Sequence, residues 1–197
     1  MPSALAAAFP SAPFARVVVA LIAATLAVGL AGAPSLARAA QHAIVRACAS
    51  DRLPAEILDG QEAQSREPLP LVEATTPAAT LRLAVAADAP ARELGLMCVL
   101  RLRPQHGMIF AFSRESDWEF WMKNTLVPLD MIWIRADGTV TTVAANVPAS
   151  TRTTPDALLP RRRGRGLYVV EIRAGEAAAD GIAPGVHVML PALRTDR

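Results

Sequence analysis

The stretch MIWIRADGTVTTVA, residues 131–144, constrains the fold more than any other part of the chain. Its Asp137-Gly138 pair lies between two runs of apolar and β-branched residues, and Asp-Gly is a dipeptide that favours the tight turn of a β-hairpin. Two strands, 131–135 and 139–144, are therefore predicted on either side of the turn. The chain is expected to be built largely from β-strands.

Alternation of apolar and polar residues predicts further strands, and two short helices accompany them. The helix Ala89–Leu94 has Asp88 as its N-cap and Pro90 in its first turn, and it closes near Gly95. A second short helix precedes Gly181, a usual C-terminal glycine. The further predicted strands are 80–86, 107–112, 118–124, 166–172 and 186–190.

About seven short strands, closely spaced turn signals and the lack of βαβ alternation indicate an all-β fold. We predict a compact β-sandwich, a jelly-roll-like fold or a partly open barrel, with one or two short helices. The segment PRRRGRG, residues 160–166, is interpreted as an exposed loop, with Arg161–Arg165 solvated. Contact of this loop with a phosphate or an acidic partner is the alternative.

The N-terminus has the composition of a secretory signal peptide. It carries one charge, Arg16, before an apolar run at 17–32, and Ala37 and Ala39 give the small-x-small pattern of a cleavage site. We predict a signal peptide at 1–39 and a periplasmic or secreted protein. The apolar run is shorter than the ~20 residues of a spanning helix, so no stable membrane span is expected after cleavage. An uncleaved anchor is the alternative.

The remainder divides into a tail and a domain. Residues 40–79 contain four prolines and no sustained apolar period, which predicts a flexible, Pro-containing N-terminal tail. Regular alternation begins at Thr80, so residues 80–197 are predicted to form a single β domain.

Charge and cysteine usage narrow the possible partners. Of the 20 basic residues, Arg16 and Arg38 lie in the predicted signal peptide, so 18 remain beside 18 acidic residues. A near-neutral chain does not favour a nucleic-acid partner. Cys48 and Cys98 would meet an oxidising compartment after export, so a disulfide between them is one hypothesis and two free thiols the other. Neither has a Cys or His at metal-ligand spacing, and no cofactor is expected.

Four blocks in this order resemble one known family: RELGLM, HGMIFAF, FWMKNTLVPLDMIWIRADGTV and VVEIRAGEAAADGIAPG. The chain is similar to the family called domain of unknown function 192 over about Leu81 to Leu190. The resemblance implies an all-β sandwich or jelly-roll fold and an uncharacterised protein that is often exported from bacteria. It implies no established activity. Where the family often has an acid after the last turn glycine, this chain has Val186.

The segment FWMKNTLVPLD, residues 120–130, is the candidate site. Strand alternation places Phe120 and Met122 toward the core, and Trp121 and Lys123 outward. An exposed indole beside polar groups suits a polar small molecule or a saccharide, so a ligand-binding or accessory module is the leading hypothesis. The candidate ligand-binding residues are Trp121, Lys123, Asn124, Thr125, Asp130 and Glu93.

Three alternatives stay open at this point. The segment is a structural signature of the fold without a site, in which Asp130 bonds backbone amides or pairs with a cation. A hydrolase or lyase would use Lys123, Asp130 and Glu93 as acid–base groups, although no catalytic motif accompanies them. A protein that handles Cu(I) would use soft thioethers and an imidazole. The candidate copper ligands are Met97, His106, Met108 and Met122.

Overall fold

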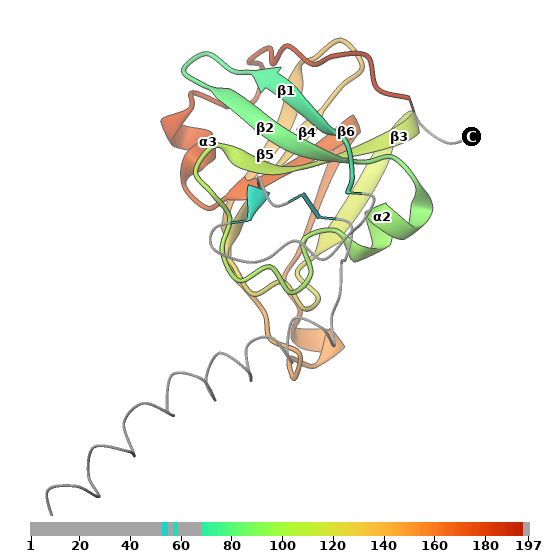
Figure 1. Ribbon diagram of the computed structural model, residues 1–197, viewed down its shortest axis with the longest axis vertical. Coiled ribbons are helices and arrows are strands. Elements are labelled where there is room, and N and C mark those ends of the chain that lie inside the picture. The colour runs from blue at the N-terminus through green and yellow to red at the C-terminus, as the bar shows by residue number, and fades with distance from the viewer. Residues whose placement is uncertain (1–52, 55–56, 59–67, 195–197) are drawn as a thin grey trace, which may run out of the picture. The chain divides into compact units, whose positions relative to one another are not determined.

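The computed structural model describes residues 53–54, 57–58 and 68–194 (Figure 1). The predicted signal peptide at 1–39 lies outside the described residues. The elements, in chain order, are β1 (Leu71–Thr75), β2 (Thr80–Ala86), α2 (Ala89–Leu94), β3 (His106–Trp121), β4 (Leu129–Ile134), β5 (Val140–Val147), the 3₁₀ helix η2 (Asp156–Leu158), β6 (Arg161–Arg173) and α3 (Glu176–Ala179). None of the described helices is long and apolar enough to cross a membrane.

The strands form one mixed sheet in the order β1-β2-β3-β6-β4-β5. Strands β2 and β3 are parallel, and the other neighbouring pairs are antiparallel. The edge strands β1 and β5 do not pair with each other, so the sheet is not closed into a barrel. The predicted all-β class is confirmed, but the described residues contain six strands in one sheet, where about seven strands in a sandwich or barrel were expected.

Two of the seven predicted strands are not separate strands of the sheet, and β1 is an additional one. The segments 107–112 and 118–124 belong to one long strand, β3, whose pairing with β6 shifts register between Ala111 and Ser116. The segment 186–190 makes only isolated bridges, because its residues meet two separate partners. His187 bridges to Thr139, and Met189 bridges to Thr75.

The sheet also begins earlier than predicted. Strand β1 lies inside the segment 40–79 that was expected to be a flexible tail, and it pairs with β2 along its whole length. Before it, four apolar side chains are buried in the core: Leu53, Ile57, Leu58 and Leu69. The structured region therefore starts well before Thr80. The prolines around β1 hid it, since they interrupt any periodic pattern.

Both faces of the sheet are covered. All six residues of β4 are buried, as expected for a strand with a core on each side. One core cluster contains Met131 and Trp133 together with Ala91 of α2, and the other contains Ile132 and Ala177 of α3. Figure 1 shows α2 and α3 at different places around the sheet. The candidate site lies next to the first cluster.

Candidate functional site

The arginine-rich segment is part of β6 and not a loop. Residues 161–166 pair with residues 116–121 of β3 in antiparallel register. Glu119 accepts from both Arg161 at 3.1 Å and Arg163 at 3.2 Å. The prediction of a solvated loop at Arg161–Arg165 was wrong. In this paired region, every second residue of β6 lies opposite an outward-facing residue of β3. The segment has no alternation of apolar and polar residues, so the sequence pattern did not indicate a strand.

Trp121 ends β3 and lies opposite Arg161 in the ladder. Its side chain is 37% exposed, whereas the neighbouring Met122 is fully buried, which confirms the predicted alternation. Two cations lie over the indole: the Lys123 ammonium is 5.1 Å from the ring centroid, and the Arg161 guanidinium carbon is 5.0 Å away. Lys123 also pairs with Asp156 of η2 at 3.7 Å. The outward face of the segment is therefore an aromatic ring in contact with two basic groups.

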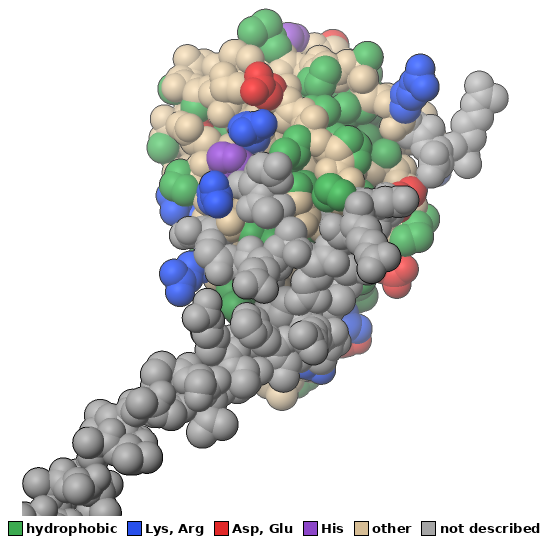
Figure 2. All heavy atoms as spheres, in the orientation of Figure 1, with side chains coloured by type: hydrophobic (Ala, Val, Ile, Leu, Met, Phe, Trp, Pro, Cys, Tyr) green, Lys and Arg blue, Asp and Glu red, His purple; other side chains and the backbone are tan. Residues whose placement is uncertain are grey.

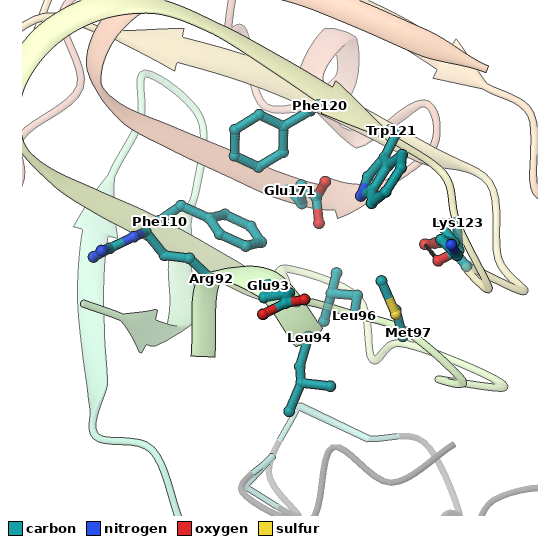
Figure 3. Close-up of a pocket in the computed structure, with 12 residues that line it drawn as sticks. Arg92, Glu93, Leu94, Leu96, Met97, Phe110, Phe120, Trp121, Lys123 and Glu171 are labelled. Atoms are coloured by element: carbon teal, nitrogen blue, oxygen red, sulfur yellow. Dashed lines mark hydrogen bonds between the residues drawn. The ribbon is translucent and has the colours of Figure 1, made fainter. Parts of the chain in front are cut away.

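A pocket opens between this end of β3 and helix α2 (Figure 3). Its inner part has a volume of about 30 Å³ and continues into an outer depression of about 480 Å³. Trp121, Lys123 and Glu93 line both parts, and Thr125 lines the inner part. The structure thus brings together four of the six predicted ligand-binding residues. The other residues of the inner part are Arg92, Leu94, Gly95, Leu96, Met97, Phe110, Phe120 and Glu171.

Glu171 is the inner polar group of this pocket. It lies on β6 between Met108 of β3 and Met131 of β4, both fully buried, and its own exposed fraction is 5%. Figure 3 shows its carboxyl group directed into the space between Phe120, Trp121 and helix α2. Burial raises the pKa of Glu171 to about 8, so the carboxyl keeps its proton at neutral pH. No hydrogen bond or ion pair reaches this carboxyl from the described part of the chain.

Glu171 was not among the residues predicted from the sequence. A single acid in the run VVEI reads as the outward residue of a half-buried strand. Because β6 is a central strand with both faces covered, that acid had to be buried. The usable signal was an acid surrounded by β-branched residues on both sides, which is typical of a strand without a solvent face.

Helix α2 forms the opposite wall, and its geometry follows from its caps. Asp88 accepts from the Ala91 amide at 2.7 Å, and Gly95 ends the helix with φ of 50°. Arg92 points away from the solvent opening: its guanidinium donates to the carbonyls of Ala87 and Ala111 and lies over the Phe112 ring. The cation of Arg92 is therefore already used to fasten the helix to the sheet.

Asn124 and Thr125 support the pocket from behind. Asn124 has φ of 53°, a left-handed conformation that asparagine tolerates, and its carbonyl accepts from the Cys98 amide at 2.8 Å. Its side-chain amide lies 4.0 Å from the sulfur of Met97. Thr125 is buried, and its hydroxyl donates to the Lys123 carbonyl. These contacts fix the turn after β3, and Asn124 does not line the pocket.

Asp130 lies away from the pocket. Its side chain is fully buried, and each carboxylate oxygen accepts one backbone amide. One oxygen accepts from Asn146 at 2.7 Å and the other from Ala177 at 2.9 Å. Asp130 therefore ties the end of β5 and the start of α3 to β4, as the structural alternative supposed.

The candidate copper ligands occupy different kinds of position. Met108 and Met122 are fully buried in the first core cluster, and Met97 lines the pocket. The imidazole of His106 lies 2.7 Å from the Pro104 carbonyl. Within the described ranges, no group of three or more His, Cys, Asp or Glu side chains could hold a metal ion.

Cys98 is buried and disulfide-bonded. The chain contains one other cysteine, Cys48, which lies outside the described residues. The Cys48–Cys98 pairing stays a prediction. Cys98 lies in the segment that follows α2, next to Met97 of the pocket.

Basic side chains do not gather on the face drawn in Figure 2, where Lys and Arg lie apart from one another among neutral and acidic groups. In the ladder, Arg165 pairs with Asp117 at 3.7 Å. Arg161, Arg163 and Arg165 of β6 thus have acidic partners within the chain.

Two solved structures are similar to this chain. One is a protein from Sinorhizobium meliloti 1021 that is described as a candidate transcription regulator. It is 30% identical, with a TM-score of 0.55, and the match covers 64% of this chain and 98% of that one. The other is a protein of unknown function from Novosphingobium aromaticivorans. It is 28% identical, with a TM-score of 0.52, and the match covers 72% and 96%. No curated protein shows a significant match.

The family comparison agrees with the extent of the sheet. The profile of the family domain of unknown function 192, described as an uncharacterized ACR, matches residues 71–190. The match begins at the first residue of β1 and includes every wall of the pocket. Since it covers more than half of the sequence, the chain belongs to the domain of unknown function 192 family.

Proposed function

We propose that the protein binds a small polar molecule in the pocket between helix α2 and the end of β3. The observation that carries this proposal is the carboxyl group of Glu171. This carboxyl lines the inner part of the pocket and has no ion pair with the described residues, so a ligand could bond to it. The outer depression has room for the rest of such a molecule.

The outer part of the pocket has the groups that orient a polar ligand. Trp121 supplies an aromatic surface, and Lys123 and Glu93 supply charges of opposite sign at the rim. This set differs from the predicted patch in three respects: Glu171 takes the inner polar role, and neither Asn124 nor Asp130 lines the pocket. Saccharides remain among the polar molecules to be screened, because an indole and carboxyl groups are common in sugar sites.

A thermal-shift screen of the purified protein with sugars, nucleotides, amines, carboxylic acids and peptidoglycan fragments tests this proposal. Any compound that binds the folded state raises the melting temperature by mass action. Trp121→Ala should abolish the shift, whereas Met189→Ala, an exposed apolar residue outside the pocket, should preserve it. A shift that survives Trp121→Ala and Glu171→Gln would place the ligand elsewhere and overturn the proposal.

We also propose that the protein acts outside the cytoplasm, in the periplasm or as a secreted protein, after cleavage behind Ala39. The apolar run at 17–32 and the cleavage pattern motivate this proposal. The disulfide at Cys98 supports it, since disulfides persist in oxidising compartments. N-terminal sequencing of the exported protein should return Ala40 first, and a chain that still begins at Met1 would contradict the proposed cleavage.

A further inference from the structure

We propose that the ligand carries a primary ammonium group, which enters the inner part of the pocket and pairs with the Glu171 carboxylate. This inference rests on the proposed function and names the chemical class of the ligand. Three features of the pocket point to it: the lack of an ion-pair partner for Glu171, the aromatic surroundings of its carboxyl, and the size of the inner cavity.

The pocket contains two basic and two acidic side chains, but only the acids lack partners. Arg92 is bonded to two carbonyls and lies over Phe112, and Lys123 contacts Asp156 and Trp121. Neither Glu93 nor Glu171 takes part in an ion pair within the described ranges. Glu171 is therefore the inner carboxyl group that a ligand could still engage, and a cation in contact with it would stabilise its ionised form.

Aromatic rings surround the entrance to Glu171. Phe110 and Phe120 meet edge to face with centroids 4.8 Å apart, and Trp121 lies beside them on the pocket wall. Figure 3 shows these three side chains around the Glu171 carboxyl. Ring faces attract cations through their quadrupole, and the attraction grows when the cation is desolvated. A carboxylate behind aromatic rings is thus suited to an organic cation.

The inner volume selects the kind of cation. About 30 Å³ is available there, and a cavity needs roughly 10–15 Å³ of this kind to hold one water molecule. An –NH₃⁺ head has about the size of a water molecule and fits, whereas a quaternary ammonium does not. The alkyl part of the ligand would lie in the outer depression beside Leu94 and Met97.

Binding must exchange a proton for the ligand's charge. In the free protein Glu171 is protonated, so the reaction is Glu171–COOH + R–NH₃⁺ → Glu171–COO⁻···⁺H₃N–R + H⁺. The charged groups nearest to this exchange are Arg92 and Glu93 on α2 and Lys123 after β3. Strands β3 and β4 present only the uncharged Met108 and Met131 next to Glu171. Affinity should therefore follow the titration of Glu171.

Calorimetric titration of the purified protein with n-butylamine tests this inference. Burial places the pKa of Glu171 at about 8, so the affinity should rise about 50-fold from pH 6 to pH 8. At pH 7 about 0.9 proton should be released for each amine bound, measured as the dependence of the heat on buffer ionisation. Tetramethylammonium, n-butanol and butyrate should bind at least tenfold more weakly.

Two variants distinguish the effect of the Glu171 carboxyl from the effect of the protein's overall charge. Glu171→Gln keeps the shape of the protonated acid, so it should fold normally, and it should lose both n-butylamine binding and proton release. Glu73→Gln removes an acid from the exposed side of β1 and should change neither. Binding that is independent of pH, or that survives Glu171→Gln, would overturn the ammonium inference.

The outcomes also distinguish this inference from the proposed function. If a neutral or anionic compound of the wider screen binds and is lost in Trp121→Ala, the pocket is a ligand site but not an ammonium site. If none of the screened compounds, n-butylamine included, shifts the melting temperature of the wild type, the proposed function fails together with the inference.

Discussion

Two buried carboxyl groups of this protein have opposite surroundings. Asp130 accepts one backbone amide on each oxygen, whereas Glu171 has neither a donor nor a cation among the described residues. A carboxylate with such bonds holds parts of the chain together, and one without them is costly unless it remains protonated or finds a partner from outside. The first arrangement serves stability, and the second is typical of a site.

Asp130→Ala should therefore lower the free energy of unfolding by about 1–3 kcal/mol, because it leaves the buried amide of Ala177 and the partly buried amide of Asn146 without their acceptor. Lys123→Met should change it by no more than about 1 kcal/mol, since the Lys123–Asp156 pair is exposed. Urea unfolding of the two variants checks this contrast. An equal loss in both would make Lys123 part of the scaffold.

Glu171 should make the protein less stable as the pH rises. In the unfolded chain its carboxyl ionises near its ordinary value of 4.5, but in the folded protein its pKa is about 8. Between these values the unfolded state binds fewer protons, so stability that is present below pH 4.5 is lost progressively up to pH 8. The steepest loss is about 1.4 kcal/mol per pH unit.

Glu171→Gln removes this titration, and comparison with the wild type isolates it. Burial also raises the pKa values of Glu176 and Asp180, but both groups are present in both proteins, so their contributions cancel. Urea unfolding at pH 5, 6, 7 and 8 should show that the free energy of unfolding of the variant increases relative to that of the wild type as the pH rises. A difference that is constant across this range would contradict the prediction.

At the scale of elements, the paired ends of β3 and β6 have two different faces. One face carries charged side chains, and the other packs closely against the Trp133 ring. Arg161, Arg163 and Arg165 of β6 point outward, and the alternate positions are Arg162, Gly164 and Gly166. A Cβ on Gly164 would lie 2.5 Å from an atom of the Trp133 ring. That ring is fully buried, and its Nε1 donates to the Trp118 carbonyl at 3.1 Å. It has no room to move.

Gly164→Ala should thus destabilise the protein by about 1–3 kcal/mol through overpacking. The neighbouring Arg163→Ala, on the exposed face, is the matched control and should cost about 0–1 kcal/mol. Thermal melts of both variants provide the measurement. If Gly164→Ala melts like the wild type, the close packing of Trp133 on β6 is not a constraint on this position.

Sequence patterns correctly predicted the strands and helices that have one apolar and one polar face. The bounds of β2 and α2 match the predicted ones, because alternation marks the strand and Asp88, Pro90 and Gly95 mark the helix. The Arg-Gly alternation of β6 escaped detection, since neither of its faces reads as apolar. The pocket was predicted in its outer part, around Trp121 and Lys123, but its inner acid required knowledge that β6 is central in the sheet.

At the scale of the whole molecule, the first described residues contribute core and not tail. Leu53, Ile57 and Leu58 are at most 3% exposed. The Ile57 carbonyl accepts from the Arg103 amide at 3.1 Å, and the Leu58 carbonyl accepts from the Arg103 side chain at 3.0 Å. This segment packs against the connection between α2 and β3, which also forms part of the pocket wall.

A chain shortened to begin at Pro77 should fail to unfold cooperatively. It lacks β1 and four buried side chains, those of Leu53, Ile57, Leu58 and Leu69. Each such side chain contributes roughly 1.5–3 kcal/mol, so their sum is comparable with the whole stability of a domain, about 5–15 kcal/mol. A chain that begins at Val45 should retain the transition, because residues 45–197 form one compact unit.

The disulfide requires a control, since the shorter chain also lacks Cys48. Cys98→Ser in the chain that begins at Val45 removes the disulfide at Cys98 and leaves the apolar segment in place. If packing decides the outcome, this variant still unfolds cooperatively by circular dichroism, and Ile57→Ala costs about 2–5 kcal/mol in the same background. If the chain that begins at Pro77 melts cooperatively near the wild-type temperature, the segment before β1 is dispensable and Thr80 is close to the true boundary.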